Sequence, residues 1–470
     1  MLFSSTLFLI YFLPIFFTLY FVLPKAVKNY FIVSASILFY AWGAPSFVFV
    51  LLSTVVVNFT FAHLIYNRTN KIKKIFLVVA VVFNLAFLLY FKYANFFIDN
   101  FNILLSSFGI EAVSVAKIIL PIGISFFTFH QLSFIIDIYR GVKPPMRNIL
   151  DYALYILIFP QLIAGPIIRY HEISDQIEGR NKAFNVDQVL LGFLRFSIGL
   201  AKKVLIANVL GKEADKIFDL PVEQLDFAMS WLGAITYTFQ IYFDFSGYSD
   251  MAIGLAKMMG FTFPENFNNP YIAQSITDFW RRWHISLSRW MRDYLYIPLG
   301  GNKVSGLRLY FNLWIVFLIS GFWHGAEWTF ILWGAYHGFF LAIERLFLSK
   351  ILEKTTVFIR LIYSFTIVIL GWVLFRATTM DQAFLFIKKM FSFSSFYEYE
   401  YSNQLIVVLL LAFVFSFAPL LYKKDVSQNS GVALTLKSYS LNVVIIVLLM
   451  IMSVSSITSS DFNPFIYFKF

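Results

Sequence analysis

Apolar runs long enough to cross a lipid bilayer recur from one end of this chain to the other. A membrane-spanning helix needs about 20 mostly apolar residues, and residues 2–23, 75–91 and 309–347 are runs of this kind. Only 13% of the 470 residues are charged, whereas an average soluble domain has roughly 25%. The sequence therefore excludes a soluble globular protein and predicts roughly ten to twelve spans or half-spans.

The pattern within the apolar runs distinguishes helices from a barrel. Only helices and closed barrels cross a bilayer, and barrel strands alternate apolar with polar residues. Residues 75–91 do not alternate. We predict an all-α polytopic membrane protein in which the 95 aromatic residues (59 Phe, 26 Tyr, 10 Trp) provide lipid-facing bulk and interfacial anchors rather than a nucleic-acid surface. No linker separates a soluble domain, so residues 1–470 are predicted to form one membrane domain.

The basic residues predict an orientation in the membrane. Lys25 and Lys28 follow the first apolar run, which has no small-residue cleavage site and is therefore interpreted as a retained span rather than a signal peptide. Because cytoplasmic loops carry excess lysine and arginine, these lysines are placed inside and the N-terminus outside. The alternation then puts residues 213–226 outside, Lys423 and Lys424 inside, and the C-terminus outside. Basic cytoplasmic loops also account for the net charge of +11.

Several kinds of chemistry lose support from missing motifs. The chain has no cysteine, which excludes disulfides, thiolate zinc sites and any protein thioester. It also has no P-loop, no G-x-S-x-G elbow and no H-E-x-x-H, and its six histidines lack metal-ligand spacing. We therefore predict neither a bound metal nor a permanently bound cofactor.

His324 is the histidine that a structural role explains least well. It interrupts the apolar stretch 309–347 and is flanked by Gly321 and Gly325. These glycines permit a broken or re-entrant helix, and non-helical backbone at membrane depth is tolerated only where it lines a cavity or is buried in protein. A neutral imidazole in such a dry site suits a general base that activates a hydroxyl. The alternative is close helix packing with an incidental histidine.

Residues 278–296 predict an amphipathic helix that begins near Ser275 and ends before Pro298. At 100° per residue, one face carries charge and the opposite face is aromatic. The charged face holds Asp278, Arg282, Arg289 and Asp293, and the other holds Trp280, Trp283, Leu287, Trp290 and Met291. His284 projects from the aromatic side, which indicates a polar partner or a cavity. The helix could also be a structural element lying in the membrane interface.

The remaining histidines have simpler interpretations. His63 and His130 are expected to be buried, each satisfied by one backbone hydrogen bond, and His171 is expected to be solvated in a polar loop. Arg281 and Arg282 could hold the phosphates of an activated donor, although arginines beside a membrane are also ordinary anchors.

The residues from 278–301 and 320–338 resemble the membrane-bound O-acyltransferase family. The second segment contains Phe-Trp-His-Gly at 322–325 and Trp-Gly-Ala-Tyr-His-Gly at 333–338. Residues 1–5, 159–166 and 242–250 match one branch, the bacterial polysaccharide O-acetyltransferases that serve alginate and peptidoglycan and are sisters of the teichoic acid D-alanyl transferases. The core motifs thus run over 159–347.

This resemblance implies a ring of helices around a thin central region, with a cytoplasmic funnel for acetyl-CoA and a short tunnel to the outer face. His324 matches the family's catalytic histidine and His284 a second family histidine. Trp323, Arg281 and Arg282 are assigned to the acyl donor. No esterase-like domain is attached, which implies a separate periplasmic transferase of the SGNH type as partner. The location implied is the bacterial inner membrane, with both termini periplasmic.

The C-terminal aromatic tail, 459–470, resembles a terminal motif of the same branch, in which a tyrosine is proposed to receive the acyl group. Tyr467 is therefore the third predicted catalytic residue, although an aromatic tail can also be an interfacial anchor. Its phenol oxygen would carry acetyl from cytoplasmic acetyl-CoA toward an extracytoplasmic polysaccharide, with peptidoglycan favoured. The alternatives are alginate as acceptor, D-alanyl transfer from a carrier protein, or a membrane transporter of acyl groups or solutes.

Overall fold

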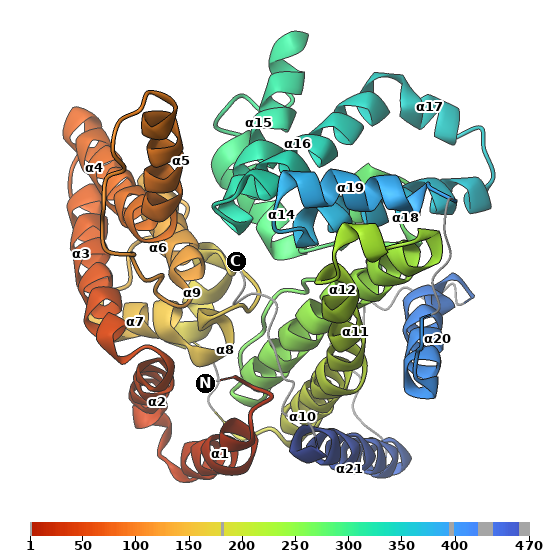
Figure 1. The fold of residues 1–470 in the computed structure, drawn as a ribbon. Coiled ribbons are helices and arrows are strands. Elements are labelled where there is room, and N and C mark those ends of the chain that lie inside the picture. Colours follow the sequence, from red (N-terminus) through yellow and green to blue (C-terminus); the bar gives the residue numbers. More distant parts are fainter. Residues whose placement is uncertain (1, 180–182, 394–398, 422–435, 460–470) are drawn as a thin grey trace. The chain divides into compact units, whose positions relative to one another are not determined.

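The computed structural model describes residues 2–179, 183–393, 399–421 and 436–459. Within these ranges every regular element is a helix and no strand occurs (Figure 1). The prediction of an all-α protein is therefore confirmed.

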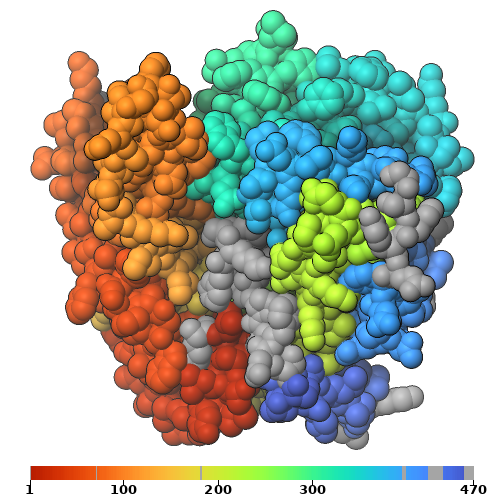
Figure 2. Space-filling view, in the orientation of Figure 1, coloured from red at the N-terminus to blue at the C-terminus, as the bar shows by residue number. Residues whose placement is uncertain are grey.

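Six of the described helical segments are long and apolar enough to cross a membrane. They are Pro45–Tyr66, Lys71–Ser107, Trp328–Leu352, Val357–Arg376, Asn403–Leu420 and Ser438–Ser459, and a shorter apolar helix covers Leu7–Val22. Exposed side chains on Lys71–Ser107 include Ile75, Val82 and Phe101, and Figure 2 shows this segment in orange at the surface of the face in view. Large apolar side chains exposed along long helices are typical of contact with lipid, in agreement with a polytopic membrane protein.

The described chain divides into two compact units. The first consists chiefly of residues 7–185 with 259–263. Its helices are α1 (Leu13–Val22), α2 (Lys28–Gly43), α3 (Val48–Tyr66), α4 (Asn70–Leu88), α5 (Ala94–Ser107), α6 (Ile124–Arg140), α7 (Ile149–Leu157), α8 (Phe159–Leu162) and α9 (Tyr170–Gly179). Helix α6 is buried along nearly its whole length and packs against α3, α4, α7 and α9, so it forms the centre of this unit.

The second unit consists of residues 3–6, 186–258 and the described residues from 264 onward. Its helices are α10 (Val186–Ala201), α11 (Asn208–Phe218), α12 (Phe227–Met258), α13 (Ile276–Arg282), α14 (Ile285–Met291), α15 (Leu307–His324), α16 (Trp328–Ile343), α17 (Ser349–Leu352), α18 (Val357–Arg376), α19 (Met380–Met390), α20 (Asn403–Phe417) and α21 (Leu436–Ser459). All of the segments that carry His284, His324 and His337 belong to this unit.

The 32-residue helix α12 runs through the second unit and is almost entirely buried. Its partner α10 approaches it closely at two pairs of glycines. A Cβ atom on Gly199 would lie 2.5 Å from the carbonyl oxygen of Gly247, and one on Gly192 would lie 2.7 Å from that of Gly254. Since real Cβ atoms do not approach this closely, the backbones can pack at this distance only because these residues have no side chain.

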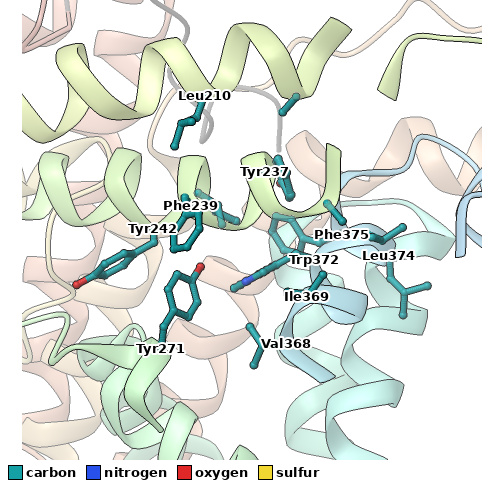
Figure 3. Close-up of a cluster of buried hydrophobic side chains, with 14 of the residues drawn as sticks. Leu210, Tyr237, Phe239, Tyr242, Tyr271, Val368, Ile369, Trp372, Leu374 and Phe375 are labelled. Carbon is teal, nitrogen blue, oxygen red and sulfur yellow. The ribbon is translucent and has the colours of Figure 1, made fainter. Parts of the chain in front are cut away.

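Aromatic side chains from α12 and α18 fill the space beside the histidines. Figure 3 shows Tyr237, Phe239 and Tyr242 of α12 around Tyr271, with Trp372 of α18 pointing its indole nitrogen toward the Tyr271 hydroxyl. The Tyr271 hydroxyl donates to the backbone carbonyl oxygen of Thr238 at 2.5 Å. This apolar cluster holds the loop before α13 against α12.

Candidate active site

The glycine-flanked break that the sequence predicts is present at His324. Helix α15 ends at this residue, and Gly325 continues in an extended conformation before α16 begins at Trp328. A Cβ on Gly325 would lie 2.1 Å from the Phe330 ring, and one on Gly321 would lie 2.3 Å from the Phe330 carbonyl oxygen. The two glycines therefore have both of the roles considered from the sequence. They permit the helix break at His324, and they let α15 and α16 pack closely.

Aromatic rings surround the His324 imidazole. Its ring centroid lies 4.8 Å from that of Trp323, 5.2 Å from that of Trp333 and 5.3 Å from that of Phe375. All three neighbours are buried, and His324 itself is 7% exposed. The residue that the sequence identified as the strongest catalytic candidate thus lies in a site largely shielded from solvent.

The amphipathic helix predicted over 278–296 is not continuous, and this prediction is wrong. Helix α13 starts as predicted with Ser275 as its N-cap but ends at Arg282. His284 adopts a left-handed conformation with φ of 44°, α14 follows, and Arg292–Tyr296 forms a π-helical turn. A helical face argument cannot extend across this break, because His284 redirects the chain.

The break places His284 in a buried position in contact with the other elements of the site. Its ring lies 4.7 Å from Phe245 of α12 and 6.4 Å from Trp323 of α15. His284 lies outside the six candidate spans, and burial lowers its pKa to about 3. The imidazole is therefore neutral at physiological pH. Since Trp323 touches both His284 and His324, the structure brings these three predicted site residues together.

A third histidine, His337, belongs to the same group of side chains and was not predicted as a site residue. It is fully buried on α16, with its ring 5.1 Å from Trp333 and 5.0 Å from Trp280. Trp333 also contacts His324, so its indole is in ring contact with both imidazoles. A Cβ on Gly371 of α18 would lie 2.7 Å from His337 Nε2, so a glycine there is required to seat this ring. The four-residue spacing from Trp333 was the sequence signal that could have indicated it.

We refer to His284, His324, His337, Trp280, Trp323 and Trp333 as the histidine cluster. Its members come from α13, the α13–α14 break, α15 and α16, which are all elements of the second unit. Buried Glu344 anchors one of these elements, helix α13. Its carboxylate accepts hydrogen bonds from the backbone N–H groups of Ile276 and Thr277 at the start of this helix, at 2.6 and 2.8 Å. Such bonds satisfy orphan donors at a helix start.

The two arginines assigned to the donor have different surroundings. Arg282 forms an ion pair with Asp278 at 2.9 Å and donates to the Asn268 carbonyl oxygen at 3.3 Å. Arg281 is exposed, with no hydrogen bond or ion pair to the described part of the chain. Neither side chain is in ring contact with the histidine cluster. Of the two, Arg281 is the one whose guanidinium is available to a ligand.

The other histidines were predicted with mixed success. His63 Nδ1 bonds to the Phe59 carbonyl oxygen at 3.0 Å, and His130 Nε2 accepts from the Ile168 N–H at 3.3 Å, which confirms a backbone bond for each. His130 is buried as expected, whereas His63 is only half-buried, so its predicted burial is wrong. His171 is not merely solvated: its Nδ1 lies 2.8 Å from a carboxylate oxygen of buried Asp137. The sequence could not indicate this pair, since 34 residues separate its members.

Two further features lie apart from the histidine cluster or beyond the described residues. A cavity of about 690 Å³ is lined by polar and apolar residues in and just before α11, at the start of α20 and at the end of α21, and none of the histidines lines it. Tyr467 and the tail from 460 onward lie outside the described residues. Within the described ranges, no three His, Asp or Glu side chains lie together in a way that could hold a metal ion.

The chain is similar to known proteins along its whole length. A model of the membrane-bound O-acyltransferase family matches residues 140–375, which contain the complete histidine cluster. The chain is 43% identical to a probable alginate O-acetylase of Azotobacter vinelandii, over the full length of both proteins. It is 40% identical to the peptidoglycan O-acetyltransferase of Helicobacter pylori, over 83% of this chain and 80% of that protein.

A more distant similarity links the chain to a related activity. It is 30% identical to the teichoic acid D-alanyltransferase of Bacillus subtilis, over 48% of this chain and 59% of that protein. All three relatives are named for acyl transfer, and none for transport. With the family match over half its length and relatives along all of it, the chain belongs to the membrane-bound O-acyltransferase family and is an O-acyltransferase.

Proposed function

We propose that this protein takes acetyl from cytoplasmic acetyl-CoA and passes it across the membrane for O-acetylation of an extracytoplasmic polysaccharide. The observation that carries the proposal is the buried position of His324 at a helix break inside the family-matched segment, ringed by Trp323, Trp333 and Phe375. Peptidoglycan is the proposed acceptor and alginate the alternative. Relatives named for these two acceptors are 40% and 43% identical to the chain, respectively, so sequence identity supports both acceptors about equally.

The chemistry follows from what an uncharged imidazole can do in a dry site. His324 accepts the proton of the attacking hydroxyl while the oxygen of that hydroxyl bonds to the acetyl carbon. The carbon–sulfur bond then breaks, and the leaving thiolate recovers the proton from the imidazolium. The aromatic rings around His324 exclude water, which would otherwise hydrolyse the thioester.

The proposed route needs an acceptor oxygen on the outer side and a partner to complete the transfer. Tyr467 is the proposed first acceptor: its phenol attacks the thioester, and the resulting acetyl ester is handed to a periplasmic transferase of the SGNH type. The basis for this step is the resemblance of the C-terminal tail. Without a cysteine in the chain, a carrier on this protein must be an oxygen or a nitrogen.

Labelled donors test this proposal directly. Membrane vesicles with the wild-type protein are incubated with acetyl-CoA that carries the label in its acetyl group. The protein should become labelled on Tyr467, whereas a carrier protein charged with labelled D-alanine should transfer no label to it. Tyr467→Phe keeps the ring and removes the oxygen, so it should lower labelling to background without lowering the amount of protein. Polymer acetylation by Tyr467→Phe at the wild-type rate would mean direct handover through His324. Labelling only by the D-alanyl carrier would overturn the choice of donor.

The difference between the two arginines predicts which one acts on the donor. Arg281→Ala should raise the KM for acetyl-CoA by up to about fivefold, which is the effect of an exposed charge pair worth as much as about 1 kcal/mol. Arg282→Ala removes the Asp278 pair and should instead lower thermal stability with little change in KM. Steady-state kinetics at two salt concentrations would measure the KM of both variants, and thermal unfolding would measure the stability of Arg282→Ala. An unchanged KM for Arg281→Ala would mean that the phosphates of the donor are held elsewhere.

A further inference from the structure

One residue outside the predicted site binds His284 and the two residues that follow it. Asn266 lies in the segment between α12 and α13 and is 1% exposed. Its side-chain oxygen Oδ1 lies 3.1 Å from His284 Nδ1, and it also accepts from the backbone N–H and the hydroxyl of Ser286 at 3.3 and 2.9 Å. Its backbone carbonyl accepts from the Ile285 N–H at 2.9 Å. Asn266 thus binds three consecutive residues at the α13–α14 break.

These contacts determine which way the Asn266 amide faces. A backbone N–H can only donate a hydrogen bond, so the atom facing Ser286 N must be the amide oxygen and not the NH₂ group. The same oxygen faces His284 Nδ1. Because an amide oxygen only accepts, Nδ1 must carry a proton and donate it to this bond.

The proton on Nδ1 determines the state of the other ring nitrogen. In a neutral imidazole only one nitrogen is protonated, so Nε2 has a free lone pair. His284 Nε2 is buried and has no hydrogen-bond partner among residues 2–179, 183–393, 399–421 and 436–459. A buried acceptor without a partner is costly unless another group fills the role. The left-handed backbone of His284 is a further cost at the same position.

We propose that Asn266 is a positioning residue that holds His284 as the Nδ1–H tautomer, so that Nε2 accepts a hydrogen bond from a protic group of a substrate in the histidine cluster. The identity of that substrate rests on the proposed function, whereas the tautomer of His284 follows from its contact with Asn266. Asn266 also caps α14, and a capping role alone would not require any particular tautomer of the imidazole. The two roles therefore predict different results.

Nitrogen-15 NMR of the full-length protein in lipid, with labelled histidine, reads the tautomer without any activity. The His284 signals are those lost in His284→Gln. We expect a protonated Nδ1 and an unprotonated Nε2 in the wild-type protein, and loss of this preference in Asn266→Ala. A proton on Nε2 in the wild-type protein would overturn the proposal. Because this readout needs no acyl donor, failure of the proposed function would not affect it.

Asn266→Asp provides the second test, because its carboxylate keeps the acceptor and hence the cap. A negative charge beside an imidazole raises its pKa by about one to three units, and a protonated His284 has no acceptor lone pair. Activity should therefore be lost on acidification at a pH about one to three units higher than in the wild type. Ser286→Ala removes one donor to the same oxygen and should keep the wild-type midpoint. An unchanged midpoint in Asn266→Asp would leave Asn266 as a cap only.

Other charged groups near His284 are already engaged and would not produce such a shift. On α12, Asp244 next to Phe245 forms an ion pair with Lys203. On α13, Arg282 is paired with Asp278. On α15 the titratable neighbour is His324, beyond Trp323. The double variant Asn266→Asp with Asp278→Asn tests whether the Arg282–Asp278 pair contributes to the pH shift. The upward shift of the activity midpoint should persist in this double variant.

Discussion

His324→Ala should lower acyl transfer by about 10²–10⁴-fold, the usual effect of losing a positioned general base, while the protein stays in the membrane. The reason is that the imidazole lies at a helix break among Trp323, Trp333 and Phe375. Among the described residues, the other bases of the histidine cluster are His284 and His337, so few groups could replace His324. Transfer of label from acetyl-CoA in membrane vesicles measures the effect.

Two further variants keep this prediction interpretable. His324→Gln fills more of the space than alanine, so it should fold even if the alanine variant leaves a destabilising cavity, and it should be as inactive. His63→Gln is the matched control and should retain wild-type activity. Among the described residues, the His63 ring forms its one hydrogen bond with the Phe59 carbonyl oxygen, and His63 belongs to the first unit rather than to the unit of the histidine cluster. Substantial transfer by His324→Gln would exclude His324 as the base.

Lys203→Met should lower the free energy of unfolding by about 3–5 kcal/mol, the cost of leaving one partner of a buried ion pair without the other. Lys203 Nζ lies 2.8 Å from an Asp244 carboxylate oxygen, and the two side chains are 4% and 2% exposed. The pair joins the segment before α11 to α12, directly beside the close glycine contacts of α10 and α12. Thermal unfolding in a mild detergent measures the loss.

The double variant Lys203→Met with Asp244→Leu separates the charge effect from packing. Replacing a whole buried pair by apolar side chains of similar volume is often neutral or stabilising, so the double variant should recover most of the loss. Arg292→Ala is the exposed comparison. Its pair with Asp293 has an arginine side chain that is 58% exposed, and removing it should cost at most about 1 kcal/mol. If Lys203→Met were as stable as the wild type, Asp244 would not be left as an unpaired buried charge, which would mean that water reaches the Lys203–Asp244 pair.

Local sequence was enough for the features that depend on local physics. Apolar runs predict helices in a membrane because the backbone can satisfy its own hydrogen bonds there only in a helix or a closed barrel. Ser275 predicts the start of α13, and Gly321 and Gly325 predict the break at His324, because capping and the absence of a side chain act within a few residues. His324 can therefore be selected from its sequence neighbours alone.

Contacts between segments that are distant in the sequence could not be predicted from local sequence. Periodicity predicted one helix over 278–296, whereas Asn266 binds the freed N–H groups at 285 and 286 and stabilises a break at His284. Likewise, the buried acceptor of His171 is Asp137 of another helix. His337 joins the candidate site only because α15 and α16 bring Trp333 into ring contact with both His337 and His324. Helix propensity extends over one or two turns, while the bonds of Asn266 to Ser286 and of His171 to Asp137 join residues 20 and 34 positions apart. The sequence alone determined that the chain is helical and lies in a membrane, and it singled out His324 as the strongest catalytic candidate. Tertiary packing decided where the segment 278–296 breaks and which polar side chains meet, because buried polar groups are paired with whatever partners the fold brings to them.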